Sequence, residues 1–132
     1  MHTDSEALIR SYFRAIERGV PAGELAGFLH DEIRQCEFPS RLNPNGRIRG
    51  KAEMLADFER GKSLLSGQEY RIRTLVVSGD RVCAETAWTG TLAVPVGSLK
   101  AGDAMKADFG VFFRLRDGLI VEQNNYDCIH PW

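Results

Sequence analysis

Cysteine and histidine are scarce in this 132-residue sequence, and their spacing excludes several classes of protein. The three cysteines, Cys36, Cys83 and Cys128, are odd in number and lie more than forty residues apart. Neither a disulfide framework nor a zinc-binding motif fits that spacing. The three histidines are dispersed as well, and no metal-ligand spacing recurs. We therefore expect neither a bound metal nor a cofactor.

Long hydrophobic runs and an excess of one charge are also missing. No apolar run approaches the roughly 20 residues of a membrane-spanning helix, and the first residues, MHTDSEALIR, lack the apolar stretch of a signal peptide. The 17 Lys and Arg residues nearly balance 18 Asp and Glu residues, and the basic residues are scattered, unlike a nucleic-acid-binding surface. We expect a cytoplasmic protein without nucleic-acid or membrane partners, folded as one domain over residues 1–132.

Helical periodicity dominates the first half of the chain. Thr3 and Glu6 form a capping-box pattern, after which apolar residues recur at helical spacing until Gly19 ends the run. Pro21 can open a second, shorter helix. A third helix is predicted over residues 51–65. A short strand, EIRQCEF, and a polar loop, PSRLNPNGRIRG, separate the second helix from the third.

The periodicity changes to two from Gln68 onward, which is typical of strands. QEYRIRTLVV and RVCAETAWTGTLAV flank one tight turn, and MKADFGVFFRLR and LIVEQNNYDCI flank another at Asp117-Gly118. Helices followed by a meander of antiparallel strands predict an α+β fold, with the helices against one face of a curved sheet. One strand sorts by face, and its apolar side should face the helices: Met105, Ala107, Phe109, Val111, Phe113 and Leu115.

Four stretches carry a resemblance to a known family: RSYFRAIERG, IRGKAEM, WTGTLAVPVGSLKAGDAMKADF and FFRLRDGLIVEQNNYDCIHPW. In order and spacing they resemble the SnoaL-like proteins of the nuclear transport factor 2-like (ketosteroid isomerase-like) superfamily. The resemblance implies a cone-shaped fold, in which a strongly curved, mostly antiparallel sheet wraps around three helices and leaves an axial pocket. It also implies a homodimer that pairs through the outer sheet face. The reaction stays open, because this fold hosts isomerases, hydrolases, cyclases, dehydratases and binding modules.

The resemblance points to three proton-handling candidates, Tyr12, Glu37 and Asp127. Tyr12 lines up with a ketosteroid isomerase tyrosine that donates a hydrogen bond to an oxyanion, although its hydroxyl could equally be satisfied at the rim of the helix. Glu37 falls where the isomerases place their general base, but a shift of one residue would put Phe38 there, on the opposite face. Arg41 follows closely, so a structural Glu37–Arg41 pair is an equal alternative to a catalytic base.

Two reactions of the superfamily meet objections in this sequence. The aspartate that completes the isomerase oxyanion hole would fall near Val111, and Asp108 lies on the other face, so ketosteroid isomerase activity is not expected. The cyclases use an aspartate at a fixed distance from the last turn, and counting from Gly118 puts that position at Cys128. Asp127 is one residue early and lies on the wrong face of a regular strand unless a β-bulge intervenes.

The last strand mixes amides and an acid with aromatic residues, which suits the wall of a pocket better than a dry core. Its polar groups could instead lie on the outer sheet face. The expected ligand-binding residues are Arg41, Trp88, Gln123, Asn125, Phe58 and Phe113. Two hypotheses follow: an enzyme that performs cofactor-free acid/base chemistry on a small, largely apolar molecule, or a non-catalytic ligand-binding or dimerisation module. A cavity filled by aromatic side chains, with Glu37 bonded to Arg41, would favour the module.

Overall fold

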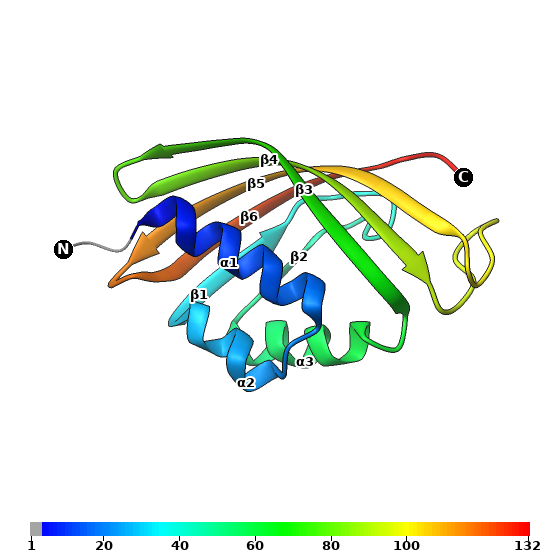
Figure 1. Cartoon of the computed structure of the whole chain (residues 1–132), viewed down its shortest axis with the longest axis horizontal. Helices are drawn as coiled ribbons and strands as arrows, with labels where there is room; N and C mark the ends of the chain where they lie inside the picture. Colours follow the sequence, from blue (N-terminus) through cyan, green and yellow to red (C-terminus); the bar gives the residue numbers. More distant parts are fainter. Residues whose placement is uncertain (1–3) are drawn as a thin grey trace.

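The computed structural model describes residues 4–132 and has three helices on one side of a curved six-stranded sheet (Figure 1). In chain order the elements are α1 (Ser5–Arg18), α2 (Ala22–Leu25), the 3₁₀ turn η1 (Ala26–Phe28), β1 (Leu29–Glu37), β2 (Arg47–Arg49), α3 (Lys51–Gly61), β3 (Leu65–Ser78), β4 (Arg81–Leu92), β5 (Ala104–Arg116) and β6 (Leu119–Ile129). No helix within residues 4–132 is long and apolar enough to cross a membrane.

The sheet has the strand order β2-β1-β6-β5-β4-β3. Strands β3 to β6 form an antiparallel meander, and β1 joins it by pairing in parallel with β6. This arrangement confirms the predicted α+β fold with a curved, mostly antiparallel sheet. It also places the first and last strands side by side, although they are far apart in the sequence (Figure 1). Tyr12 of α1 reaches β6 through a hydrogen bond to Gln123.

Capping residues fix both ends of α1. The predicted cap Thr3 lies outside the described residues; Asp4 is the N-cap, and its Oδ1 accepts hydrogen bonds from the backbone N–H of Glu6 at 3.0 Å and of Ala7 at 3.3 Å. Gly19 ends the helix as predicted, because its φ of 62° lies in the left-handed region that glycine adopts without strain.

Two predictions about the middle of the chain were wrong. The third helix ends at Gly61, and Leu65 already begins β3, where it pairs with Leu92. The polar loop contains a short edge strand, β2, whose Arg49 lies opposite Gln35 and whose Arg47 lies opposite Glu37. Its arginines are tied to β1 and α3 by ion pairs, which local strand propensity does not reveal.

The core lies between α1 and the inner face of the sheet. Ile9, Tyr12 and Phe13 of α1 are buried against a set that includes Val111 and Phe113 of β5. Rings of Phe13 and Phe113 meet edge to face with centroids 5.9 Å apart. The predicted inner face of β5 is confirmed, and each large side chain buried there contributes roughly 1.5–3 kcal/mol.

A β-bulge in β6 decides which side chains of the last strand face inward. Leu115 pairs with Ile120 but Arg114 pairs with Glu122, so Val121 is an extra residue in β6. The residues after the bulge therefore alternate in the opposite phase from a regular strand. As a result Asp127 lies opposite the inward residue Phe109, and the prediction for a regular strand, which put Asp127 on the wrong face, does not hold.

Candidate functional site

A cavity of about 670 Å³ lies between the inner face of the sheet and the helices. Its deep wall is formed by side chains from α1, β1, α3 and four strands of the meander. Exposed side chains of the β1–β2 loop and of the α3–β3 connection, including Leu42, Lys62 and Leu64, border its solvent side. The cavity thus has both apolar and polar groups in its lining.

Seven of the nine residues predicted for the site line this cavity: Tyr12, Glu37, Asp127, Phe58, Trp88, Gln123 and Asn125. The other two lie elsewhere. Arg41 lies outside the lining, with its guanidinium 4.3 Å from the ring centroid of Trp132. Phe113 is 1% exposed and belongs to the core beside α1 rather than to the cavity wall. A direct ligand contact from either residue is therefore not supported.

Glu37 points to the cavity, and Phe38 points away from it. The Phe38 ring is on the outer face of the sheet, stacked on Tyr126 at 4.4 Å between centroids. Glu37 does not pair with Arg41. Its Oε1 accepts from Arg47 Nε at 2.6 Å, and its Oε2 lies 3.5 Å from Arg49 Nη2. The prediction of Arg41 as the partner was wrong because β2 pairs with β1 and so places Arg47 and Arg49 beside Glu37. No pattern in the sequence indicates this pairing.

The same arginines bind a second carboxylate, on α3. Asp57 Oδ2 lies 2.6 Å from Arg49 Nη1 and 3.1 Å from Arg47 Nη1, and Arg60 pairs with Oδ1. Glu37 and Asp57 are thus both engaged by guanidinium groups at the edge of the cavity. Arg47, Arg49 and Asp57 were not predicted, because the two arginines lie in the polar loop and Asp57 lies on α3, and only the fold brings them together with Glu37.

A chain of hydrogen bonds leads from this cluster into the core. Arg49 donates to Gln35 Oε1, and Gln35 Nε2 donates to Asn125 Oδ1 at 2.8 Å. Gln123 Nε2 donates to the same Asn125 oxygen at 3.0 Å, and the Tyr12 hydroxyl donates to Gln123 Oε1 at 2.8 Å. Burial raises the pKa of Tyr12 above its ordinary value, so the phenol keeps its proton. Gln35 was not predicted, although its alternation with Glu37 along β1 placed both on one face.

Asp127 has a different environment from the other carboxylates of the cavity. Its Oδ1 is buried and finds no hydrogen-bond partner within residues 4–132. Burial raises the pKa of Asp127 to about 6; the nearby negative charge of Glu37 acts in the same direction, and Arg49 opposes it. The carboxyl can therefore be protonated or ionised near neutral pH.

Aromatic rings form a flat apolar wall beside Asp127. Trp88 and Phe109 stack with centroids 5.6 Å apart and planes at 26°, and Trp88 Nε1 donates to Gln68 Oε1 at 3.0 Å. Gly90 makes room for the indole, because a Cβ there would come within 2.5 Å of the Trp88 ring.

In residues 4–132, no group of three or more His, Cys, Asp or Glu side chains is arranged to hold a metal ion.

Comparisons with known proteins agree with this fold. The family described as SnoaL-like domain matches residues 9–123. IdmH from Streptomyces antibioticus, a proposed polyketide cyclase, has a TM-score of 0.78 at 18% identity over 95% of this chain and 92% of its own. An LEH-like epoxide hydrolase of M. tuberculosis has a TM-score of 0.72 at 16% identity, over 92% of this chain and 80% of its own.

A third similar structure is a Catenulispora acidiphila protein with a ketosteroid isomerase-like fold, solved with trimethylamine. Its TM-score is 0.72 at 15% identity, over 94% of this chain and 86% of its own. At these identities the likeness concerns the fold alone. No curated protein sequence matches the chain.

Proposed function

The chain belongs to the SnoaL-like domain family. From that premise we propose that it binds a small, largely apolar molecule in the cavity and performs cofactor-free acid/base chemistry on it. In this proposal Asp127 is the proton-transferring group. The observation that carries this proposal is the half-buried Asp127 carboxyl at the cavity wall: its Oδ1 has no hydrogen-bond partner among the described residues, and its pKa is raised to about 6. A general base is most effective when its pKa lies near the working pH.

The shape and lining of the cavity support a ligand of modest size with a flat apolar part. A volume of about 670 Å³ falls within the range of small-molecule sites. Trp88 and Phe109 offer a planar surface, and Phe58 lines the opposite, helical side. The polar groups near the centre are amides and a carboxyl, which would orient one polar group of the ligand.

The chemistry that fits these groups is proton transfer at a carbon next to a carbonyl. The Asp127 carboxylate takes the proton, the C–H electron pair becomes part of an enol or enolate, and the carboxylic acid so formed returns the proton to carbon. Isomerisations and aldol-type cyclisations both begin with this step. The resemblance puts the second acid of the isomerases near Val111, which is a buried apolar residue here, so the ketosteroid isomerase reaction remains disfavoured. The objection to a cyclase-type reaction is removed, because the bulge turns Asp127 to the cavity.

Hydrogen–deuterium exchange tests this proposal without knowledge of the natural substrate. The protein is incubated in D₂O with 2-acetylnaphthalene, and exchange of the methyl protons next to the carbonyl is followed by NMR. We expect catalysed exchange whose rate rises through a pKa near 6, and a loss of about 100-fold or more in Asp127→Asn. Asp108→Asn on the outer face is the matched control and should leave the rate unchanged.

Equal exchange by wild type and Asp127→Asn would contradict the role of Asp127. Binding of the ketone without any catalysed exchange would support the alternative, a non-catalytic ligand-binding module of the same fold.

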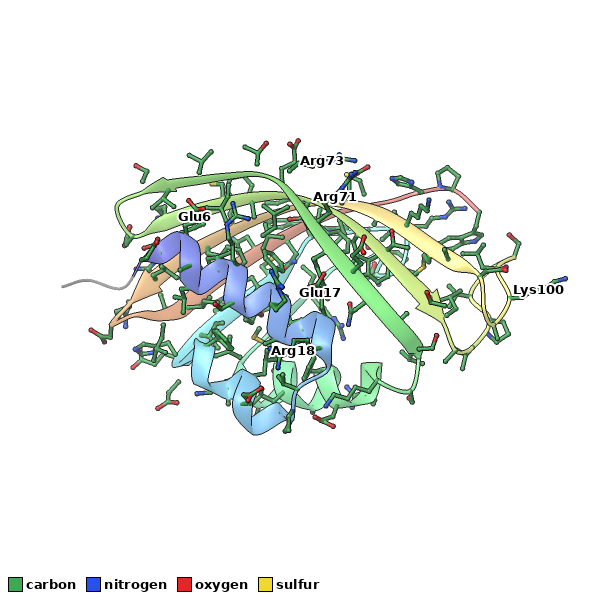
Figure 2. The ribbon with its side chains drawn as sticks, in the orientation of Figure 1. Glu6, Glu17, Arg18, Arg71, Arg73 and Lys100 are labelled. Atoms are coloured by element: carbon green, nitrogen blue, oxygen red, sulfur yellow. The ribbon has the colours of Figure 1, made fainter. Side chains whose placement is uncertain are left out.

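We further propose that the protein is a homodimer that pairs through the outer face of the sheet. Three aromatic side chains gather there, with Phe112 and Tyr126 49% and 45% exposed and Phe38 stacked on Tyr126. The outer face also carries charges of both signs, such as Arg73 and Asp108, which form an ion pair at 3.0 Å; Arg71 and Arg73 extend away from the helices in Figure 2. A face with mixed charges around an apolar centre suits a second copy of itself, as two-fold symmetry requires.

A further inference from the structure

We propose that Asn125 is the residue that binds the ligand's carbonyl oxygen, and that Arg49 orients it through Gln35. This inference rests on the proposed function, because it names how the same cavity recognises its substrate. The ligand class that follows is a ketone or ester whose carbonyl oxygen accepts a hydrogen bond from Asn125 Nδ2. Arg49 and Gln35 are positioning residues, since they act on the ligand only through Asn125.

The direction of the hydrogen bonds follows from Arg49. A guanidinium carries only donors, so the atom of Gln35 that it contacts must be the oxygen. The Gln35 nitrogen is then the atom that contacts Asn125, and it donates to Oδ1 at 2.8 Å. The side-chain oxygen of Asn125 therefore faces β1, and its NH₂ group takes no part in these hydrogen bonds. Arg49 is itself held by Asp57 and Glu37, so the orientation starts from a group with fixed partners.

The neighbouring polar groups are already used within the protein. Gln123 donates to the Asn125 oxygen at 3.0 Å and accepts from the Tyr12 hydroxyl at 2.8 Å. The proton of Tyr12 is therefore given to Gln123 and not to a ligand. Among the described residues, by contrast, none accepts a hydrogen bond from Asn125 Nδ2, and Asn125 borders the cavity. The donor role that the resemblance assigns to Tyr12 passes to Asn125.

The position of Asn125 relative to Asp127 suits the proposed reaction. The two residues are two apart on one face of β6, after the bulge, so their side chains start roughly 6–7 Å from each other. A carbonyl oxygen bound to Asn125 would bring the neighbouring carbon towards Asp127. The same donor would stabilise negative charge that develops on that oxygen when the proton leaves.

The test compares two probes of nearly equal shape, 2-acetylnaphthalene and 2-ethylnaphthalene, of which only the first has a carbonyl. Their dissociation constants are measured by quenching of tryptophan fluorescence in wild type and in Asn125→Asp. This variant keeps an oxygen for Gln35 and Gln123 but removes the donor. We expect the ketone to bind at least about fivefold more weakly to Asn125→Asp, and the hydrocarbon to change less than twofold. Asn124→Asp is the matched control, since Asn124 pairs with Phe112 on the outer face.

Gln35→Glu tests the orientation separately, since the carboxylate introduced by this substitution would accept from both Arg49 and Asn125. Asn125 should then rotate and lose its free donor, so that ketone binding again weakens selectively. Equal weakening of both probes in Asn125→Asp, or none, would overturn the inference and leave acid/base catalysis by Asp127 standing. If neither probe binds wild type, the inference and the proposed function fail together. Binding with the expected selectivity but without proton exchange would leave the inference standing and remove the catalytic role.

Discussion

At the scale of single residues, two carboxylates of one cavity have opposite surroundings. Glu37 is engaged by two guanidinium groups, whereas Asp127 is half-buried, with one oxygen that has no partner within residues 4–132 and a pKa raised to about 6. Pairs of acids whose environments differ in this way are typical of acid/base sites. Glu37 also contributes to the shift, because its negative charge disfavours a second charge nearby.

The raised pKa of Asp127 has a consequence for stability. The folded protein binds this proton more tightly than the unfolded chain, in which the pKa is near 3.8. The stabilisation from this proton is complete below pH 3.8 and is lost as the pH rises through 6. Asp127→Asn removes the penalty of the buried charge, so we expect it to be more stable than wild type by about 2–3 kcal/mol at pH 8 and nearly equal at pH 4. Urea denaturation at the two pH values measures the difference; equal curves at pH 8 would contradict it.

Much of the candidate site could be predicted from the sequence, but its pairings could not. The mixture of amides and an acid in the last strand indicated a pocket wall, and Gln123, Asn125 and Asp127 do line the cavity. The predicted ion-pair partner of Glu37 was wrong. Proximity in sequence favoured Arg41, whereas strand pairing brings Arg47 into contact with Glu37.

At the scale of elements, the inward-facing side of a strand could be predicted where apolar and polar residues alternate regularly, and could not be predicted where a bulge interrupts the strand. The inner face of β5 followed from its period of two, and Gly19 marked the end of α1. The bulge at Val121 was invisible, because β6 reads as an unbroken run of strand-forming residues and the extra residue shows only in its pairing with β5. One inserted position decides whether Asp127 or Cys128 faces the cavity.

The outer face of the sheet allows the proposed dimer to be tested. We expect wild type to sediment as a dimer at micromolar concentration, and Phe112→Lys as a monomer, because a charge at the centre of the aromatic cluster would be buried without a partner. Leu64→Lys is the control: Leu64 is 51% exposed, similar to Phe112, but lies at the rim of the cavity. A wild-type monomer at high micromolar concentration would remove the dimer proposal.

At the scale of the whole molecule, the three helices lie on one side of the curved sheet (Figure 1), and a cavity of about 670 Å³ lies between them and the sheet. Glu17, labelled in Figure 2, ties α1 to β3 by accepting from the backbone N–H of Tyr70 at 2.6 Å. The order of helices and strands predicted the α+β fold with a curved sheet, and the family resemblance added the expectation of a cavity. The hydrogen-bonded chain from Arg49 to Tyr12 was not predictable, because it joins α1, β1, β2 and β6 through contacts between distant parts of the sequence.

The proposed function requires that the half-buried Asp127 carboxyl at the cavity wall gains and loses a proton near neutral pH. The most direct measurement is an NMR titration of the ¹³C-labelled carboxyl groups, with the Asp127 signal assigned by its absence from Asp127→Asn. We expect a midpoint of about 6. A midpoint at or below the ordinary aspartate value near 3.8 would mean that the carboxyl is solvated or paired, and would rule out Asp127 as the proton-transferring group.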